Sequence, residues 1–352
     1  MAKVTVQNIA DALGLSRTTV SKVLNNAPGM SEKTVSLVIE KAKEMQYKHY
    51  KNMTTNAYSS ELITPSKPTG NVALLAHVIP NNFHMASALM LSLEHELGKS
   101  GYSLSLHIVS DANIANISLP NSFYIDNTDA IVCLELFDKD YSTMLCSLGK
   151  PVLFSDVYSS FKQGDLNADI LMVDNRNSVY RMLNEIIRTN KISTIGFVGD
   201  NLHCLSFLER YNGFIDIVNE YNFPEFKSHS VIDRDILFTD DNWLYNQLSA
   251  IQIPDLLFCS NDINATRVVN CLSRMGLSAP KNVLVCGFDG TPALSSINPT
   301  LTTVIIPSDE MGVLTAAIVV KRLHSSKLPK CVFSLSTKIH FNNSTNSSNA
   351  IV

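Results

Sequence analysis

Short polar segments follow five apolar runs of this sequence, at positions where side chains could bind a ligand. They are Asn81-Asn82-Phe83, Asp156, Asp200, Asn261-Asp262 and Asp289. Carboxylates, an amide and an arginine beside an aromatic wall suit a sugar, because planar groups hold its hydroxyls in bidentate hydrogen bonds and a ring packs on its apolar face. A single aspartate is more often a helix cap or a surface group. Five polar segments at equivalent positions favour a ligand-binding cleft.

Apolar runs alternate with amphipathic segments in the part of the chain that holds these residues. Strands are predicted at 72–78, 103–108, 130–134, 152–154, 170–173, 194–198, 256–259, 283–287 and 302–306. Helices are predicted at 84–99, 177–189, 205–220, 262–275 and 309–323. Repeated strand–helix units indicate parallel sheets with helices on both faces, and so many strands indicate two lobes. Ligands bind such folds just past the carboxyl ends of the strands.

The charge of the chain is unevenly distributed. Residues 1–51 hold eight basic and four acidic side chains, and the remaining 301 residues hold 20 basic and 28 acidic ones. The N-terminal part therefore carries a net charge of +4 and the rest −8. A small basic head on a large acidic body indicates a polyanionic partner for the head.

Three short helices are predicted within residues 5–46, capped by Thr5, Ser16 and Ser31. Their inner faces are Val6, Ile9, Ala10 and Leu13; Val20, Val23 and Leu24; and Val35, Val38, Ile39, Ala42 and Met45. A turn that contains Gly14 joins the first two helices, which is typical of a helix-turn-helix motif. A generic small helical bundle is the alternative, but it does not account for the basic charge.

The N-terminal end of the second helix of such a motif enters the major groove of DNA. Arg17 and Thr18 would then face base edges, and an arginine suits guanine O6 and N7. Lys22 could contact a base or a phosphate. Side chains suited to phosphate contacts are Thr5, Ser16, Thr19, Ser21, Asn25, Thr34 and Tyr47. Double-stranded DNA is the predicted partner of the head.

The string VTVQNIADALGLSRTTVSKVLNNAPGMSEKTVSLVIEKAKEMQY resembles the DNA-binding head of the LacI/GalR family of bacterial transcription regulators. TVSKVLN followed by a Ser-x-Lys-Thr helix start is a hallmark of that family. The resemblance implies a DNA-binding domain over residues 1–48 and a homodimer that reads a near-palindromic operator. It also implies that Arg17, Thr18 and Lys22 are the base-reading residues.

Residues 49–70 form a linker in which the family pattern weakens. The family has a short hinge helix here, whose leucine inserts into the minor groove. The nearest match, residues 56–62, keeps the asparagine, the alanine and Leu62, but it lacks the arginine and contains Glu61. Two interpretations stay open: a degenerate hinge helix with Leu62 as the wedge, or a flexible tether rich in Ser, Thr and Pro.

The body also resembles the family over residues 71–341, with landmarks such as Val173-Asp174-Asn175-Arg176 and Gly287-Phe288-Asp289. The implied fold class is an N-terminal all-α helix-turn-helix head plus an α/β, two-lobed, periplasmic-binding-protein-like effector and dimerisation domain. Lobe 1 is expected at about 71–171 and 305–329, and lobe 2 at about 172–304 and 330–341. The polar residues 342–352 are expected to form a disordered tail.

The positions that match effector contacts of the family are Phe83, Asp156, Arg210, Trp243, Asn261 and Asp289. Arg210 with Asp289 is the central pair that the resemblance implies. Trp243 has two open interpretations, stacking on the effector or packing in the core. The sequence departs from the family at Gly290, His84 and Met85, so the effector of a relative cannot be assumed for this chain.

Other kinds of site find little support in the sequence. Seven scattered cysteines without a Cys-x-x-Cys pair indicate free thiols, and the nine histidines lack metal-ligand spacing, so no metal and no cofactor are expected. No apolar run is long enough to span a membrane, and no signal peptide is recognisable, which favours a cytoplasmic protein that associates with the nucleoid when bound to DNA.

These observations predict a transcription regulator, most simply a repressor of sugar-utilisation genes controlled by a small sugar-like effector between the lobes. A regulator driven by a protein co-effector, of the catabolite-control type that the family includes, is the alternative. An α/β enzyme is a remote third possibility, because the common nucleotide-binding and hydrolase motifs are missing from the sequence.

Overall fold

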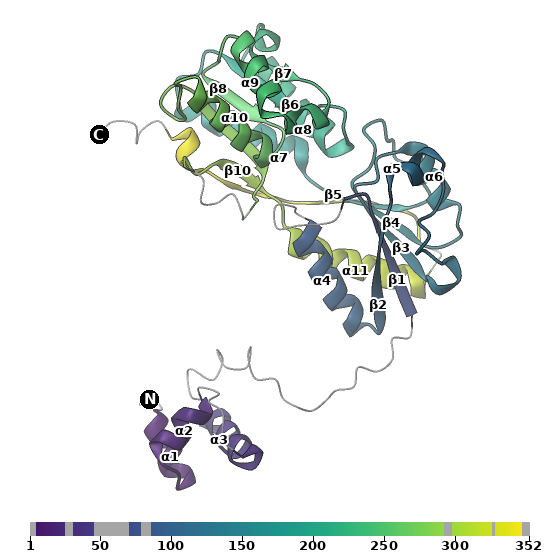
Figure 1. Cartoon of the computed structure of the whole chain (residues 1–352), viewed down its shortest axis with the longest axis vertical. Helices are drawn as coiled ribbons and strands as arrows, with labels where there is room; N and C mark the ends of the chain where they lie inside the picture. The colour runs from purple at the N-terminus through teal and green to yellow at the C-terminus, as the bar shows by residue number, and fades with distance from the viewer. Residues whose placement is uncertain are drawn as a thin grey trace. The chain divides into compact units, whose positions relative to one another are not determined.

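The computed structural model describes residues 5–24, 31–45, 70–78, 86–291, 298–325 and 328–346. The chain divides into two compact units, Met1–Ser66 and Lys67–Val352, which are called the head and the body below (Figure 1). Four of the predicted DNA-contacting and effector-contacting residues lie outside the described ranges: Asn25, Tyr47, Leu62 and Phe83. Within the described ranges, no helix is long and apolar enough to cross a bilayer.

The head consists of the three predicted helices, α1 (Val6–Leu13), α2 (Arg17–Leu24) and α3 (Glu32–Glu44). The Thr5 hydroxyl caps α1 by accepting the Asn8 N–H, and the Asn8 side chain accepts the Thr5 N–H in return. Gly14 ends α1 with φ at 64°, a left-handed conformation that glycine adopts without steric cost. The predicted turn between α1 and α2 is therefore confirmed.

One apolar cluster holds the head together. Its buried members are Ile9, Ala10, Val20, Val23, Leu24, Val38 and Ala42, with Val6, Leu13, Leu15, Val35 and Met45 packed around them. All of the inner-face residues predicted from the sequence belong to this cluster, apart from Ile39, whose side chain is not described.

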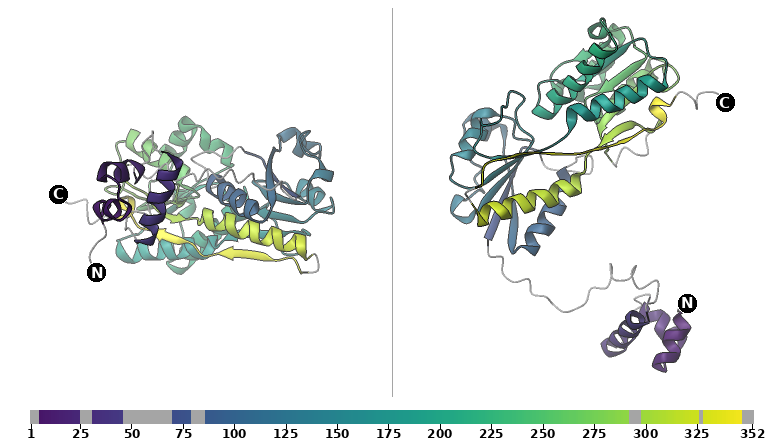
Figure 2. Two further views of the ribbon diagram at one scale, coloured as in Figure 1. Left: turned by 90° about the horizontal axis from the view of Figure 1, so that it is seen from below. Right: turned by 180° about the vertical axis from the view of Figure 1, so that it is seen from behind.

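The first lobe of the body contains a six-stranded parallel sheet in the order β11-β5-β4-β3-β1-β2. Its strands are β1 (Gly70–Ala76), β2 (Tyr102–Ile108), β3 (Ala130–Leu134), β4 (Val152–Ser155), β5 (Asp169–Val173) and β11 (Val332–Leu335). Its helices are α4 (Ala86–Lys99), α5 (Asp111–Ala115), α6 (Lys139–Cys146) and α11 (Ser308–His324). Figures 1 and 2 show α4 and α11 side by side.

The second lobe contains another six-stranded sheet, β12-β10-β9-β8-β6-β7, in which only the pairing of β12 with β10 is antiparallel. Its strands are β6 (Ile195–Gly199), β7 (Val231–Ile232), β8 (Leu256–Cys259), β9 (Leu284–Asp289), β10 (Thr302–Ile305) and β12 (Lys338–His340). Its helices are α7 (Asn175–Thr189), α8 (Leu205–Glu220), α9 (Asp241–Ala250) and α10 (Asp262–Arg274). The two-lobed α/β architecture predicted for the body is confirmed.

The chain passes between the lobes three times, after β5, after β10 and after β11 (Figure 2). The expected lobe boundaries need one correction. Residues 332–335 are expected in lobe 2, but they form β11, which pairs with β5 in the sheet of lobe 1 through Val332 and Ile170. The elements α5, α6 and α9 are not predicted by the sequence; they have 5, 8 and 10 residues, too few for a helical repeat to stand out.

The expectation of a disordered tail is wrong for its first residues. Asn343–Thr345 form a 3-10 helix in which Ser344 and Thr345 are buried. The Ser344 hydroxyl accepts the Thr302 N–H at 2.8 Å and donates to the Val285 carbonyl at 2.6 Å. These short polar side chains bind the backbone of β9 and β10, a use that their composition does not reveal.

Gly312 and Gly98 provide a test of how tightly α11 and α4 pack. A Cβ at Gly312 would clash with the Leu89 carbonyl oxygen and lie 2.7 Å from the Ser92 Cβ, both in α4. Gly312→Ala should lower the free energy of unfolding by about 1–3 kcal/mol through overpacking. Gly98 is exposed near the end of α4 with open space around it, so Gly98→Ala should raise stability by up to about 1 kcal/mol. Urea denaturation measures both, and destabilisation by both variants would contradict this packing.

Candidate functional site

The base-reading candidates of the head all lie on α2. Arg17, Thr18 and Lys22 are exposed, and Arg17 and Thr18 occupy the first turn of the helix. The Ser16 hydroxyl fixes that turn by accepting the Thr19 N–H at 3.0 Å. The first turn of α2 thus presents a guanidinium and a hydroxyl to solvent, as a recognition helix requires.

The phosphate candidates of the head are mostly capping residues. Thr5 caps α1, Ser16 caps α2, and Thr34 donates its N–H to the Ser31 hydroxyl at 3.2 Å at the start of α3. The Thr5 hydroxyl donates its proton to the Asn8 Oδ1 at 2.7 Å, and the hydroxyl pairs Ser16–Thr19 and Ser31–Thr34 are hydrogen-bonded at 2.8 Å. A phosphate contact from these hydroxyls therefore requires that they exchange one of these bonds for the phosphate oxygen. The part played by Asn25 and Tyr47 lies outside the described residues.

In the body, a cavity of about 370 Å³ lies between the two lobes. Residues from both sheets line it, and several of them stand directly at the carboxyl end of a strand. Among the predicted effector contacts, Asp156, Arg210, Asn261 and Asp289 line this cavity together. A cavity of this size with convergent polar groups is typical of a small-molecule site.

Arg210, on α8, is the best-fixed side chain of the cavity. Only 4% of it is exposed. Its guanidinium donates from Nε to the Asn175 Oδ1 at 3.1 Å and from Nη1 to the Ser260 carbonyl at 2.8 Å, and its Nη2 lies 3.0 Å from the Asp289 Oδ1. The Phe288 ring lies 3.8 Å below the guanidinium carbon. The Arg210–Asp289 contact implied by the family resemblance is present in the structure.

Asp156 follows β4 of lobe 1 and connects the lobes. It has φ at 67°, a conformation that L-residues seldom adopt. Its Oδ1 accepts the Ser206 N–H at 3.2 Å from the first turn of α8, and the adjacent Val157 carbonyl accepts the Leu205 N–H at 2.8 Å. Burial raises the pKa of Asp156, and its hydrogen bonds from Cys204, Val157 and Ser206 oppose that rise.

Two other predicted residues have structural duties. The Asn261 side chain caps α10 by accepting the Asn264 N–H at 2.8 Å. Asp200 does not line the cavity but accepts the N–H groups of Leu202 and Asp235, at 2.7 and 2.9 Å, and so holds two cavity loops together.

Trp243 lies away from the described lining of the cavity. It is half-buried on α9 and meets the Phe238 ring edge-to-face at a centroid distance of 5.2 Å. It packs against the apolar cluster on one face of the second sheet. Of the two interpretations left open for Trp243, packing in the core accounts for these contacts.

Sequence reasoning missed several residues of the cavity. Glu135, Phe137, His203, Phe207 and Asp235 also line it. Glu135 directly follows β3, so the rule that identified Asp156 could have identified it as well. Asp235 stands in a 3-10 helix (Asp235–Thr239) with no strand before it that the sequence reveals.

Asp262 follows β8 next to Asn261, and its role differs from that of an effector contact. It is 2% exposed and accepts the Thr303 hydroxyl at 2.7 Å and the Thr291 N–H at 2.9 Å. Burial raises the pKa of Asp262 to about 7, and the charge of Asp289 adds to that rise. Asp262 thereby anchors the turn that follows Asp289.

The raised pKa of Asp262 predicts how stability depends on pH. The folded protein keeps this carboxyl protonated up to about pH 7, whereas its ordinary value is 3.8. The contribution of Asp262 to stability is therefore full below about pH 4 and is lost as the pH rises to about 7. At about 1.4 kcal/mol per pKa unit, the change is on the order of 2–4 kcal/mol.

Asp262→Asn removes this titration, so its free energy of unfolding relative to wild type should rise between pH 4.5 and pH 7.5. Denaturant titrations at each pH measure the difference. Parallel profiles for the two proteins would contradict the assignment.

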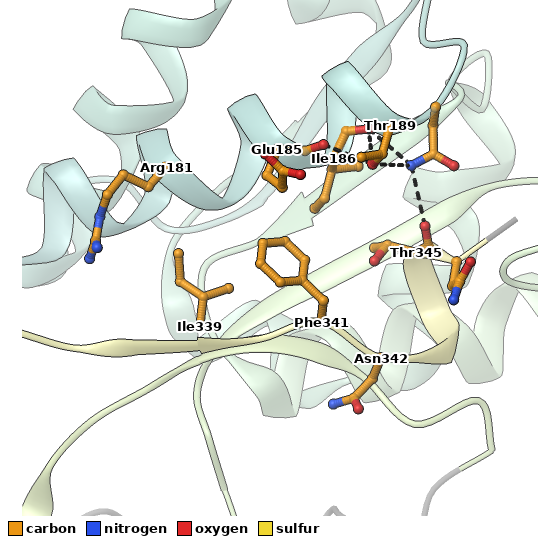
Figure 3. A pocket seen from close by; sticks show the side chains of 10 residues that line it. Arg181, Glu185, Ile186, Thr189, Ile339, Phe341, Asn342 and Thr345 are labelled. Atoms are coloured by element: carbon orange, nitrogen blue, oxygen red, sulfur yellow. Dashed lines mark hydrogen bonds between the residues drawn. The ribbon is translucent and has the colours of Figure 1, made fainter.

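A second hollow lies on lobe 2 alone, between α7 and the segment 339–346 (Figure 3). Ile186, Ile339 and Phe341 give it an apolar wall, and Arg181 and Glu185 flank it (Figure 3). Residues of lobe 1 are absent from its described lining, so movement of the lobes would not change it. Among the described residues, no group of His, Cys, Asp and Glu side chains could hold a metal ion at this hollow or elsewhere.

Two family models match the chain. Residues 5–49 match "Bacterial regulatory proteins, lacI family", and residues 187–345 match "Periplasmic binding protein-like domain". The repressor PurR of Actinobacillus pleuropneumoniae serotype 3 (strain JL03) is 23% identical over 334 residues, 92% of each chain. The NTD biosynthesis operon regulator NtdR of Bacillus subtilis (strain 168) is 22% identical over 346 residues, covering 97% of this chain and 99% of NtdR.

Solved structures share the fold. The regulator CelR in complex with cellobiose has a TM-score of 0.67 at 19% identity, covering 97% of this chain and 100% of that one. The Lac repressor dimer bound to operator and the anti-inducer ONPF has a TM-score of 0.64 at 17% identity, covering 98% and 99%. CcpA of Lactococcus lactis has a TM-score of 0.68 at 17% identity, covering 79% and 100%.

A helix-turn-helix head with an exposed recognition helix, joined to a two-lobed body with a cavity between its lobes, defines a DNA-binding transcription regulator with an effector-binding domain. The family model matched by the head and the names of the curated relatives both point to regulators of the lacI type. The head is that of the lacI family of bacterial regulatory proteins, and the body has the fold of a periplasmic binding protein-like domain.

Proposed function

We propose that this protein is a repressor of sugar-utilisation genes, acting in the cytoplasm as a homodimer on a near-palindromic operator. A small sugar-like effector binds between the lobes and changes the operator affinity. The observation that carries the proposal is the Arg210–Asp289 pair, whose guanidinium and carboxylate both line the inter-lobe cavity, with the buried Asn175 holding the guanidinium in place. Such planar groups hold vicinal hydroxyls in bidentate hydrogen bonds.

The lobes provide the means of control. The Asp156–Ser206 and Val157–Leu205 hydrogen bonds cross from one lobe to the other, next to the cavity. A ligand that favours one arrangement of the lobes shifts the protein toward it, to the extent that its affinity differs between the two. The effector-bound neighbours support a sugar: CelR binds cellobiose, and an Enterococcus faecium regulator with a TM-score of 0.64 binds ribose.

A thermal-shift screen of the full chain against sugars, sugar phosphates, polyols and nucleobases tests the proposal. A ligand at one hundred times its Kd adds about 2.7 kcal/mol to stability, which is a readily visible shift. Each hit is then added to an operator-binding assay. A hit that stabilises the protein and changes operator affinity supports the proposal. The absence of any hit would overturn it in favour of a protein co-effector.

The salt dependence of operator affinity tests the DNA-binding role proposed for the head. Operator affinity should fall by on the order of 10³-fold between 50 and 200 mM salt for about six neutralised phosphates, because binding releases counterions. Fluorescence anisotropy with a labelled duplex measures the slope. A flat profile would contradict the role assigned to the head.

A further inference from the structure

The backbone of Asp289 is held in a conformation that costs free energy. Asp289 ends β9 with φ at 114°, and Gly290 follows with φ at 68°. The turn passes so close to β10 that a Cβ at Gly290 would lie 2.8 Å from the Ile305 Cγ1. A strained residue such as Asp289 persists only where the surrounding contacts fix it. The contacts around this turn therefore decide where the Asp289 carboxylate lies.

Thr303 and Asp262 supply those contacts from two elements, β10 and the first turn of α10. The Thr303 hydroxyl accepts the Gly290 N–H at 3.3 Å and donates to the Asp262 Oδ1 at 2.7 Å. It also lies 3.3 Å from a carbonyl of its own strand, but the shorter contact with Asp262 is the better acceptor for its proton. The Asp262 Oδ2 accepts the Thr291 N–H at 2.9 Å. A continuous chain of hydrogen bonds thus holds the two residues that follow Asp289.

Only Asp289 connects this network to the described lining of the inter-lobe cavity. Thr303 is 8% exposed and Asp262 is 2% exposed, and neither belongs to that lining. Asp289 does belong to it, and its Oδ1 lies 3.0 Å from the Arg210 Nη2. A small molecule between the lobes can meet Asp289 and Arg210 directly, whereas Thr303 and Asp262 can act on it only through the turn.

The same turn is attached to a passage between the lobes. The Asp289 carbonyl accepts the Ile306 N–H at 3.2 Å, at the point where the chain leaves β10 for lobe 1. Ile306 also lines the cavity. Thr303 lies two residues before the end of β10, so the network and the Ile306 bond attach Asp289 to the same strand. A shift of the turn would therefore act on the passage after β10.

We infer that Thr303 and Asp262 are positioning residues of the effector site. They hold the turn after Asp289 so that its carboxylate serves Arg210 and the effector together, and they connect a bound effector to the passage after β10. Neither residue touches the effector. This inference rests on the proposed function and specifies how that site is built and coupled to the lobes.

Substitutions at Thr303 separate hydrogen bonding from packing. Thr303→Val keeps the shape of the side chain and removes the hydroxyl, whereas Thr303→Ser keeps the hydroxyl and removes the methyl group. Isothermal titration calorimetry of the full chain measures binding of cellobiose and ribose first, and then of the other compounds of the thermal-shift screen. Thr303→Val should weaken binding by about tenfold or more, and Thr303→Ser should stay within about threefold of wild type. A residue that only packs would give the opposite order.

Thr315→Val is the matched control. Thr315 is fully buried on α11, and its hydroxyl has no hydrogen-bond partner among the described residues. It lies outside the described lining of the cavity. The same exchange of a buried hydroxyl for a methyl group should leave binding of every compound unchanged, because no hydrogen bond of the site is removed.

Hydrogen exchange measured by mass spectrometry without any ligand tests the route through the turn. The segment 286–291 should exchange about tenfold faster in Thr303→Val than in wild type, and at the wild-type rate in Thr303→Ser. Asp255 holds the Ser193 and Thr194 N–H groups at the other end of the second sheet, at 2.7 and 2.9 Å. Exchange there should be the same in all variants, which shows that the rest of the lobe stays folded.

Weaker binding together with faster exchange of 286–291 in Thr303→Val, both restored in Thr303→Ser, supports the inference. If Thr303→Val does not fold, Thr303→Ala takes its place, because it differs from Thr303→Ser by the hydroxyl alone. Unchanged binding, unchanged exchange, or equal losses in the serine variant would overturn the inference while wild-type binding leaves the proposed function intact. If no compound of the screen binds wild type, the proposed function fails and the inference fails with it.

Discussion

Replacing Arg210 with alanine is expected to abolish the response of operator binding to a small effector and to destabilise the body by about 3 kcal/mol. The guanidinium satisfies Asn175, the Ser260 carbonyl and Asp289 at once, and it is 4% exposed. Removing one partner of a buried ion pair leaves a charge without compensation, which typically costs about 3–5 kcal/mol. The Asp289 side chain is 22% exposed, so solvent reduces that cost to the lower end.

Arg176 provides the control. It makes a bidentate ion pair with Asp216, in which Nε lies 2.6 Å from Oδ2 and Nη2 lies 2.7 Å from Oδ1, but the Arg176 side chain is 58% exposed. Arg176→Ala should cost less than about 1 kcal/mol, since exposed pairs are screened by water. Denaturant unfolding measures the loss of stability in both alanine variants. Arg210→Lys keeps the positive charge, but an ammonium group cannot form the hydrogen bonds to all three partners at once. Equal effects of Arg210→Ala and Arg176→Ala would refute the assignment.

The same variant separates two modes of regulation. If a small molecule controls the protein, Arg210→Ala should bind operator DNA normally and ignore the effector. If a protein co-effector docks elsewhere on the body, its influence on operator binding should survive the substitution. A response to a small molecule that persists in Arg210→Ala would show that the effector binds elsewhere.

The head was largely predictable because its signals are local. Capping hydroxyls, a glycine in a left-handed turn and apolar residues at helical spacing are all read within a few residues of one another. Nine of the twelve strands described in the body were predictable for the same reason, since most of them are short apolar runs. The short strands β7, β11 and β12 were not predicted. Sheet order and the pairing of β11 with β5 depend on contacts between residues 162 positions apart, which no local pattern encodes.

The site was predictable where strands end and not elsewhere. Asp156 and Asp289 follow the rule that ligands bind past the carboxyl ends of parallel strands, and both line the cavity. Asp235 lies in a short 3-10 helix whose first N–H is accepted by Asp200, 35 residues away in sequence, and no local pattern reveals this contact. Asp262 illustrates another limit, because burial, which raises its pKa to about 7, is a property of the packed structure.

Composition is a poor guide at the end of the chain. Ser344 and Thr345 stand in a polar, low-complexity string, which is typical of disorder. Their hydroxyls instead satisfy Thr302 and the backbone of β9 in the second sheet. A hydroxyl-rich segment and the first residues of β9 and β10 are complementary in hydrogen bonding, and only the fold reveals that the two are neighbours.

The second large effect is expected at the recognition helix. Arg17→Ala should weaken operator binding by about 1–3 kcal/mol per head, which for two heads of a dimer amounts to a loss of about 30-fold or more. Arg17 is exposed in the first turn of α2, where a guanidinium can bind guanine O6 and N7 in the major groove. The preference at one base position of each half-site should be lost, while the others are kept.

Selection of binding sites from a random duplex library, followed by affinity measurements, tests this prediction even though the operator sequence is not specified in advance. Lys41→Ala is the control, because Lys41 is paired with Glu44 at 2.7 Å on α3 and away from the recognition helix in sequence. The control should leave the selected sequence unchanged. Arg17→Ala that weakens binding equally to every sequence would mean that Arg17 contacts only the phosphate backbone, and base readout would then have to come from other residues of α2.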